Sequence, residues 1–182
     1  MTRKPKKVTA ESLERIALHQ LERCPTTSIK LRKTLARRVE RSLEYHQGDR
    51  YQLLALIGPL VRRLQEAGYL NDEMVAKSRA ASMHAKGHPI RAIAYKLRGE
   101  GLLQRDIDAA VAELEVDEQD PDMVAAIGWA RKKGLGPYRS LDREERRTKD
   151  MGSLARRGFS YDICRRVIDA NDVEELEASE DW

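Results

Sequence analysis

The chain has 182 residues, of which 41% are hydrophobic, only 5% aromatic and 35% charged. No apolar run approaches the roughly 18 residues of a membrane-spanning helix. The N-terminus has no apolar signal segment, so a cytoplasmic protein is expected. The net charge of +4 hides a gradient: residues 1–50 hold 13 Lys and Arg against 6 acids, whereas residues 171–182 hold 6 acids and no base. A basic body with an acidic tail favours a protein that works near nucleic acid, although a solvated helical surface would be equally charged.

Strong helix formers dominate the sequence, and no run of β-branched residues between turn signals competes with them, so an all-α fold is predicted. Residues 1–8 are expected to form a disordered basic leader. Gly58-Pro59 should kink the third helix or move its start downstream. The tail after Asn171 is expected to be frayed or disordered. Caps, glycines and prolines place the helices, in chain order, near 9–24, 27–47, 49–67, 71–86, 89–100, 104–115, 121–133, 141–157 and 160–170.

The third, sixth and ninth predicted helices repeat one apolar spacing. Their stripes are Ile57, Val61 and Leu64, then Ile107, Val111 and Leu114, then Ile163, Val167 and Ala170, with offsets of 50 and 56 residues. Such a period is typical of a helical repeat array. The predicted fold is therefore a set of tandem three-helix repeats, elongated and curved, at 9–70, 71–116 and 117–170, followed by an acidic tail at 171–182. Arrays of this kind present a long surface and usually bind an extended partner.

Motifs in all three repeats carry a resemblance to a known family. They are Gly68-Tyr69-Leu70 with Asp72, Lys86-Gly87 with Ile93 and Leu97, Gly101 as a repeat stop, Arg157-Gly158-Phe159, and SIKLRKTL at 28–35. In this order and spacing, over residues 13–170, they resemble the RecX family of bacterial recombination regulators. The chain departs from the family's usual motif residues at Met74-Val75, Pro89-Ile90 and Ala94, and it carries an insertion at 37–52.

The resemblance implies a protein that binds the RecA recombinase, or its filament on single-stranded DNA, and modulates its ATPase and recombination activity, with inhibition as the favoured direction. It also implies a role in DNA repair and the SOS response. The sequence has no phosphate-binding glycine loop, nucleophile motif or diiron spacing, so neither catalysis nor a cofactor is expected. A monomer is expected, and direct DNA binding, if present, is expected to be weak. Two alternatives remain open: a DNA-binding module with a helix-turn-helix reader, and a helical-repeat adaptor for another protein.

Basic helix faces supply the candidate contact residues for DNA or for an acidic protein surface. On the fifth predicted helix, Arg91, Tyr95 and Arg98 have i, i+4 and i+7 spacing. The remaining candidates are Lys86, Arg143, Arg146, Arg147, Arg156, Arg157 and Arg165. The competing interpretation is a solvated face whose charges are neutralised by nearby acids. If the acidic tail masks these patches, deleting residues 171–182 is expected to strengthen binding.

Three aromatic residues are given structural roles. Tyr69 and Phe159, each following a glycine, are predicted to plug their rings between helices at the repeat joints. Trp129 is predicted to lie in the core.

The histidines and cysteines do not predict a metal site. His84 and His88 have the spacing of a helical metal pair, but Gly87 should interrupt the helix between them, and no third ligand is evident. Cys24 and Cys164 lack ligand spacing and are interpreted as reduced thiols.

Overall fold

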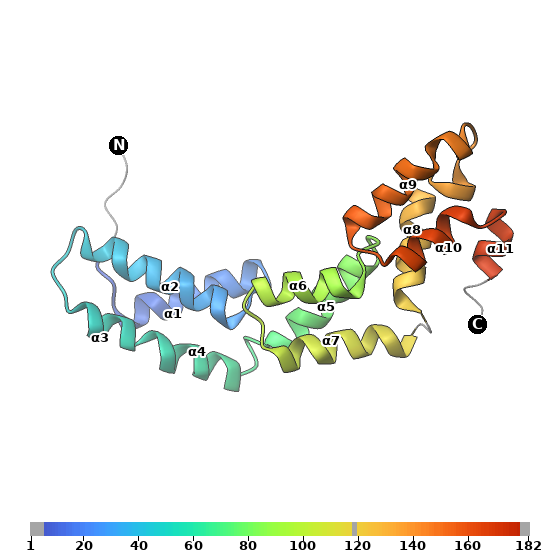
Figure 1. Ribbon diagram of the computed structural model, residues 1–182. Coiled ribbons are helices and arrows are strands. Elements are labelled where there is room, and N and C mark those ends of the chain that lie inside the picture. Colours follow the sequence, from blue (N-terminus) through green and yellow to red (C-terminus); the bar gives the residue numbers. More distant parts are fainter. Residues whose placement is uncertain (1–5, 118–119, 179–182) are drawn as a thin grey trace. The chain divides into compact units, whose positions relative to one another are not determined.

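The computed structural model describes residues 6–117 and 120–178, in which all regular secondary structure is helical (Figure 1). The predicted all-α class is therefore confirmed. The chain forms two compact units, one of Met1–Val75 with Glu100–Leu102 and one of Ala76–Gly99 with Leu103–Trp182. No helix in the described ranges is long and apolar enough to cross a membrane. The repeat boundaries after residues 70 and 116 remain predictions.

Local chemistry accounts for the helices of the first unit. This unit contains α1 (Ala10–Arg23), α2 (Ser28–Leu43), α3 (Arg50–Ala55), α4 (Ile57–Glu66) and the start of α5 (Asp72–His84). The hydroxyls of Thr9 and Thr27 cap α1 and α2 by accepting backbone N–H groups. The break between α3 and α4 precedes Gly58-Pro59, because Pro59 has no N–H to donate to the carbonyl of Ala55. The predicted interruption is confirmed.

The core of the first unit forms where the apolar stripes of its helices meet. The completely buried side chains Leu13, Leu31, Leu35, Val39 and Val61 come from α1, α2 and α4. Each stripe covers one side of its helix and leaves the other side to charged residues, as expected for surface helices of a small unit.

Val8 also belongs to this core, so the predicted disorder of residues 1–8 is wrong at this position. Val8 is only 5% exposed, and its backbone N–H donates to Ser42 Oγ at 3.1 Å. Burial of one apolar side chain and one satisfied N–H fix the chain before α1 begins. Residues 1–5 of the predicted leader lie outside the described residues.

The second unit holds the rest of α5 and the helices that follow. They are α6 (Ile90–Gly99), α7 (Gln104–Asp117), α8 (Pro121–Lys133), the short 3₁₀ helix η1 (Gly136–Tyr138), α9 (Arg143–Arg157), α10 (Tyr161–Asp169) and α11 (Val173–Ala178). Ile127, Leu154 and Val167 are completely buried where α8, α9 and α10 pack together. The buried Asp150 carboxylate accepts two hydrogen bonds from Arg139, at 3.0 and 2.7 Å, so its charge stays paired.

The predicted aromatic plugs have different outcomes. Phe159 is 5% exposed and packs in the core of the second unit, as predicted. Trp129 is half-buried at the edge of that core. Tyr69 is 65% exposed, so its predicted burial is wrong. The turn after α4 is one residue longer than the turn after α9, and Leu70 rather than Tyr69 donates its N–H to the carbonyl of Leu64 and enters the core.

The acidic tail contains a helix, so the predicted disorder after Asn171 is wrong for residues 173–178. Leu176 on α11 is only 2% exposed and joins the core of the second unit. The Glu177 carboxylate accepts hydrogen bonds from Arg131 at 2.7 Å and from the Tyr138 hydroxyl at 3.0 Å. One apolar anchor and two polar contacts hold a segment whose charge alone indicated a solvated tail. Residues 179–182, including Trp182, lie outside the described residues.

Candidate partner-binding surface

The stripe on α6 lies exposed on a well-anchored helix. Ile93 and Leu97 are completely buried on one side of α6, and Arg91, Tyr95 and Arg98 face solvent on the other. Tyr95 is 77% exposed. Arg98 donates to Gln104 Oε1 at 2.8 Å. Within the described ranges, Arg91 has no hydrogen-bond or ion-pair partner for its side chain. The stripe therefore presents two cations and an aromatic ring to a partner.

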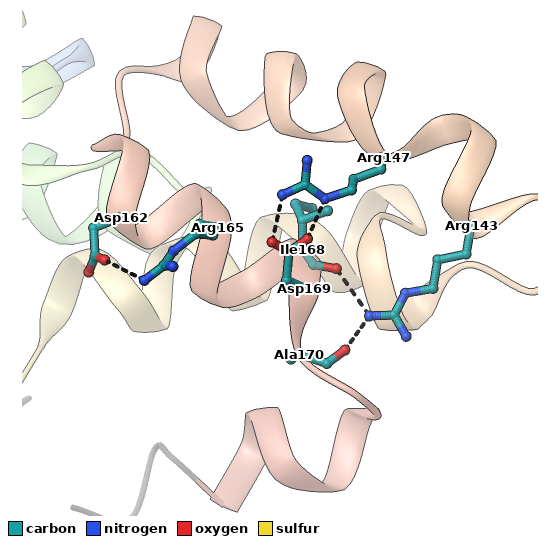
Figure 2. Close-up of polar contacts among 7 residues, drawn as sticks. All are labelled: Arg143, Arg147, Asp162, Arg165, Ile168, Asp169 and Ala170. Atoms are coloured by element: carbon teal, nitrogen blue, oxygen red, sulfur yellow. Dashed lines mark hydrogen bonds and ion pairs between the residues drawn. The ribbon is translucent and has the colours of Figure 1, made fainter.

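Two candidate arginines of α9 are bonded to the end of α10 (Figure 2). The Arg147 guanidinium makes two hydrogen bonds to the Asp169 carboxylate, at 2.7 and 2.6 Å. These bonds keep the pKa of Asp169 below its ordinary value. Arg143 donates to the carbonyls of Ile168, Ala170 and Asn171, where α10 ends. A cation bonded to the last carbonyls of a helix stabilises its C-terminus, so Arg143 and Arg147 have structural roles.

Arg157 is also a structural residue, at a joint inside the second unit. Its guanidinium carbon lies 3.5 Å from the centre of the Trp129 ring. The same guanidinium donates to the backbone carbonyls of Gly87 and Lys86. Partial burial against the indole lowers the pKa of Arg157. A stacked guanidinium with carbonyl acceptors fastens the turn between α5 and α6 to α8 and α9.

Further polar contacts close this joint. His84 Nε2 lies 2.6 Å from the carbonyl oxygen of Pro121, and the Ile90 N–H donates to the Asp122 carboxylate at 2.6 Å. Burial raises the pKa of Asp122, and the Ile90 hydrogen bond opposes that rise. Since α5 ends at His84 and α6 begins at Ile90, the predicted break between His84 and His88 is confirmed. His84 acts as a buried hydrogen-bonding group of the joint.

The remaining candidate residues are exposed to solvent, and they differ in whether another side chain pairs with them. Arg165 lies 3.6 Å from Asp162 in an exposed pair, which contributes little stability (Figure 2). The ammonium of Lys86, in the turn after α5, donates to Ser82 Oγ of α5 at 3.1 Å. Arg146 and Arg156 are exposed and have no hydrogen-bond or ion-pair partner in the part of the chain that the structure describes. The candidate surface of the second unit thus retains the α6 stripe, Arg146 and Arg156 as its least engaged members.

The first unit has a basic groove that the sequence analysis did not single out. It lies between α1 and α2 and includes Arg23, Arg37, Arg38 and Arg41 in its lining. The signal in the sequence was the spacing of three arginines within about one turn of α2. That spacing alone could not show that α1 would add Arg23 across the groove.

Comparisons with known proteins agree with this architecture. Residues 120–168 match the family model described as "RecX, third three-helix domain". The chain is similar to Regulatory protein RecX of Myxococcus xanthus (strain DK1622), with 44% identity over 173 residues that cover 93% of this chain and 90% of the relative. It is similar to the protein of the same name from Agrobacterium fabrum, with 35% identity over 109 residues that cover 59% of this chain and 55% of the relative. The protein of the same name from Thermobifida fusca is 30% identical over 164 residues, which cover 90% of this chain and 78% of the relative. No solved structure matches significantly. The extent and identity of the Myxococcus match show that this chain belongs to the RecX family of regulatory proteins.

Proposed function

We propose that this protein binds the RecA recombinase in its filament on single-stranded DNA and lowers ATP turnover and strand exchange, without catalysing a reaction itself. Membership of a family of regulatory proteins supports the regulatory role. The family resemblance of the sequence motifs supports RecA as the partner and inhibition as the direction.

The α6 stripe is the observation that carries the proposal. Arg and Tyr are over-represented among the residues that dominate binding energy at protein interfaces. Here Arg91, Tyr95 and Arg98 project from a helix whose opposite side is fixed by Ile93 and Leu97. A rigid helix loses little conformational freedom on binding, so such a stripe can bind an acidic filament surface at low entropic cost. The two guanidiniums would set orientation, and the ring would supply apolar contact.

The test measures ATP hydrolysis by RecA on single-stranded DNA with increasing amounts of this protein. Replacing both arginines of the stripe (Arg91→Glu with Arg98→Glu) should weaken the effect by at least about tenfold in concentration, or about 1.4 kcal/mol. Stability should change by less than about 0.5 kcal/mol, because both positions are exposed. The matched control is Lys96→Glu with Lys132→Glu, two exposed cations of the same unit outside the stripe. The control should act like the wild type.

Two results would contradict the proposal. Unchanged RecA ATPase at a stoichiometric excess of the wild-type protein, together with a negative pulldown of RecA filaments, would exclude RecA as the partner. Equal effects of the stripe variant and the lysine control would remove the α6 stripe from the interface. The contact would then have to involve another surface, with Arg146 and Arg156 as the next candidates.

A further inference from the structure

The groove between α1 and α2 concentrates positive charge that no acid within it neutralises. Its volume is about 770 Å³, and none of the described residues that line it is acidic. Arg37, Arg38 and Arg41 come from the α2 side and Arg23 from α1. All of these side chains are exposed, and like charges held this close repel each other. Such an arrangement is favourable when an anion occupies it.

The arginines of the groove are engaged far less than those of α9. Within the described part of the chain, Arg23, Arg38 and Arg41 make no hydrogen bond or ion pair. Arg37 makes two long bonds of 3.4 Å to groups of its own helix, the carbonyl of Lys33 and the hydroxyl of Thr34. By contrast, each of the structural arginines of α9 has short bonds to named acceptors. In the described part of the chain, the guanidinium donors of Arg23, Arg38 and Arg41 are therefore free for a ligand.

The nearest acid on α2 is already bound elsewhere. The carboxylate of Glu40 pairs with Arg50, with N–O distances of 2.7 and 2.8 Å. This pair removes the acid that could have bridged to Arg37 or Arg41 on the same helix. Glu40 is therefore engaged with Arg50 of α3 rather than with the arginines of the groove. The acids that share a hollow with Arg38, namely Glu11, Glu14 and Glu22, come from α1 and line the adjoining surface rather than the groove itself.

The spacing of these cations fits a chain of phosphates. Arg37 and Arg41 are separated by about 6 Å along α2, from a rise of 1.5 Å per residue, and Arg23 adds a cation from the other wall. Guanidinium groups bind phosphate through paired N–H donors. Tyr45, 53% exposed, follows the end of α2 at Leu43 and lies outside the lining of the groove, so the cations carry the argument. An acidic peptide would use the same cations, and the experiment below separates the two ligands.

We propose that the α1–α2 groove binds the phosphodiester backbone of single-stranded nucleic acid directly, without reading base sequence. Four arginines dominate the polar lining, beside His19, Gln20 and Thr34, and cations of this kind suit any phosphodiester backbone. This binding does not require RecA and is separate from the α6 stripe. In a nucleoprotein filament, the protein would then contact the DNA through this groove in addition to any contact with RecA.

The experiment uses the full chain and a fluorescently labelled oligothymidine, without RecA, and follows anisotropy at several salt concentrations. The groove variant is Arg38→Gln with Arg41→Gln. The matched control is Arg32→Gln with Lys33→Gln, which removes the same charge from the same helix outside the groove. Arg32 is exposed and lies on the side facing Gly58 of α4. Melting curves should be unchanged for both variants, because these side chains are exposed.

Loss of two phosphate contacts should make the slope of log affinity against log salt shallower by about 1.4, at about 0.7 per contact for single strands. Between about 50 and 200 mM salt, the groove variant should then lose about sevenfold less affinity than the wild type. The control should keep the wild-type slope. Equal slopes for the groove and control variants would overturn the proposal, as would displacement of the oligothymidine by polyglutamate at equal charge concentration, which would identify an acidic-peptide site. Because the assay contains no RecA, these outcomes leave the test of RecA regulation independent.

Discussion

Replacing Gly87 with alanine is expected to destabilise the joint between α5–α6 and α8 more than a glycine's backbone preference alone would. Gly87 has a φ of +72°, and a Cβ built on it would lie 2.9 Å from Trp129 Cβ and 3.0 Å from the carbonyl oxygen of Ala125. Gly134 of the same unit has a φ of +60°, but a Cβ there would meet only the carbonyl oxygen of Tyr138, at an ordinary 3.7 Å. Gly134→Ala is therefore a control for the left-handed backbone without the close approach.

The two substitutions separate strain from overpacking. A left-handed alanine costs about 1–2 kcal/mol at either position, and overpacking against α8 adds about 1–3 kcal/mol at Gly87 alone. For a difference near 2 kcal/mol and a urea dependence of about 2 kcal/mol per M, the Gly87→Ala midpoint should lie about 1 M below that of Gly134→Ala. Urea unfolding followed by circular dichroism measures this, and hydrogen exchange in α8 locates the loss.

Equal midpoints for the two alanine variants would refute the reasoning. That result would mean that α8 does not approach the turn closely, and that the stack of Arg157 on Trp129 does not fix this joint. A larger loss for Gly134→Ala would have the same meaning.

Three further predictions concern the second unit. Leu176→Ala should lower its unfolding free energy by about 2–5 kcal/mol, because this side chain is buried; unchanged stability would show that α11 does not pack on the core. Deleting residues 171–182 would thus remove packing as well as charge, so that deletion cannot test tail masking by itself. Burial and nearby cations lower the pKa of His88 in the folded protein. As the pH drops below about 6.5, His88 therefore binds a proton in the unfolded chain before it does so in the folded protein. The free energy of unfolding should fall over this range, until the pH reaches the lowered pKa. His88→Gln should flatten this dependence in urea titrations at several pH values, and an unchanged profile would contradict it. Arg143→Ala should lower the unfolding free energy by about 1–3 kcal/mol, because charged hydrogen bonds to the end of α10 are lost. Arg146→Ala, the control, should lower it by less than about 0.5 kcal/mol. Thermal melts of the two variants measure the difference, and equal losses would be inconsistent with the contacts of Arg143.

The positions of the helices were predictable from sequence because the signals that start and stop them act over a few residues. The hydroxyls of Thr9 and Thr27 accept N–H groups within their own first turns. Pro59 interrupts a helix through its own missing N–H. Gly158 ends α9 with a φ of +106°, and the Phe159 that follows reaches the core, as the motif predicted. The family resemblance rested on short sequence motifs of the same local kind.

Errors arose where a distant group decided the outcome. Val8 is ordered because Ser42 and the core of the first unit receive it. The acidic segment of α11 is helical because Leu176 finds a buried position. Tyr69 is exposed because the turn after α4 has one additional residue, so Leu70 enters the core instead.

The contacts of each arginine were likewise decided only by the tertiary structure. Sequence spacing placed Arg143, Arg147 and Arg91 on helix faces as equivalent cations. In the structure the first two bind acceptors more than 20 residues away, at the end of α10, while Arg91 stays exposed. Periodicity fixes the side of a helix on which a charge lies, because it depends only on 3.6 residues per turn. It cannot determine whether a carboxylate or a carbonyl from elsewhere in the chain will meet that charge, since only folding brings the two together.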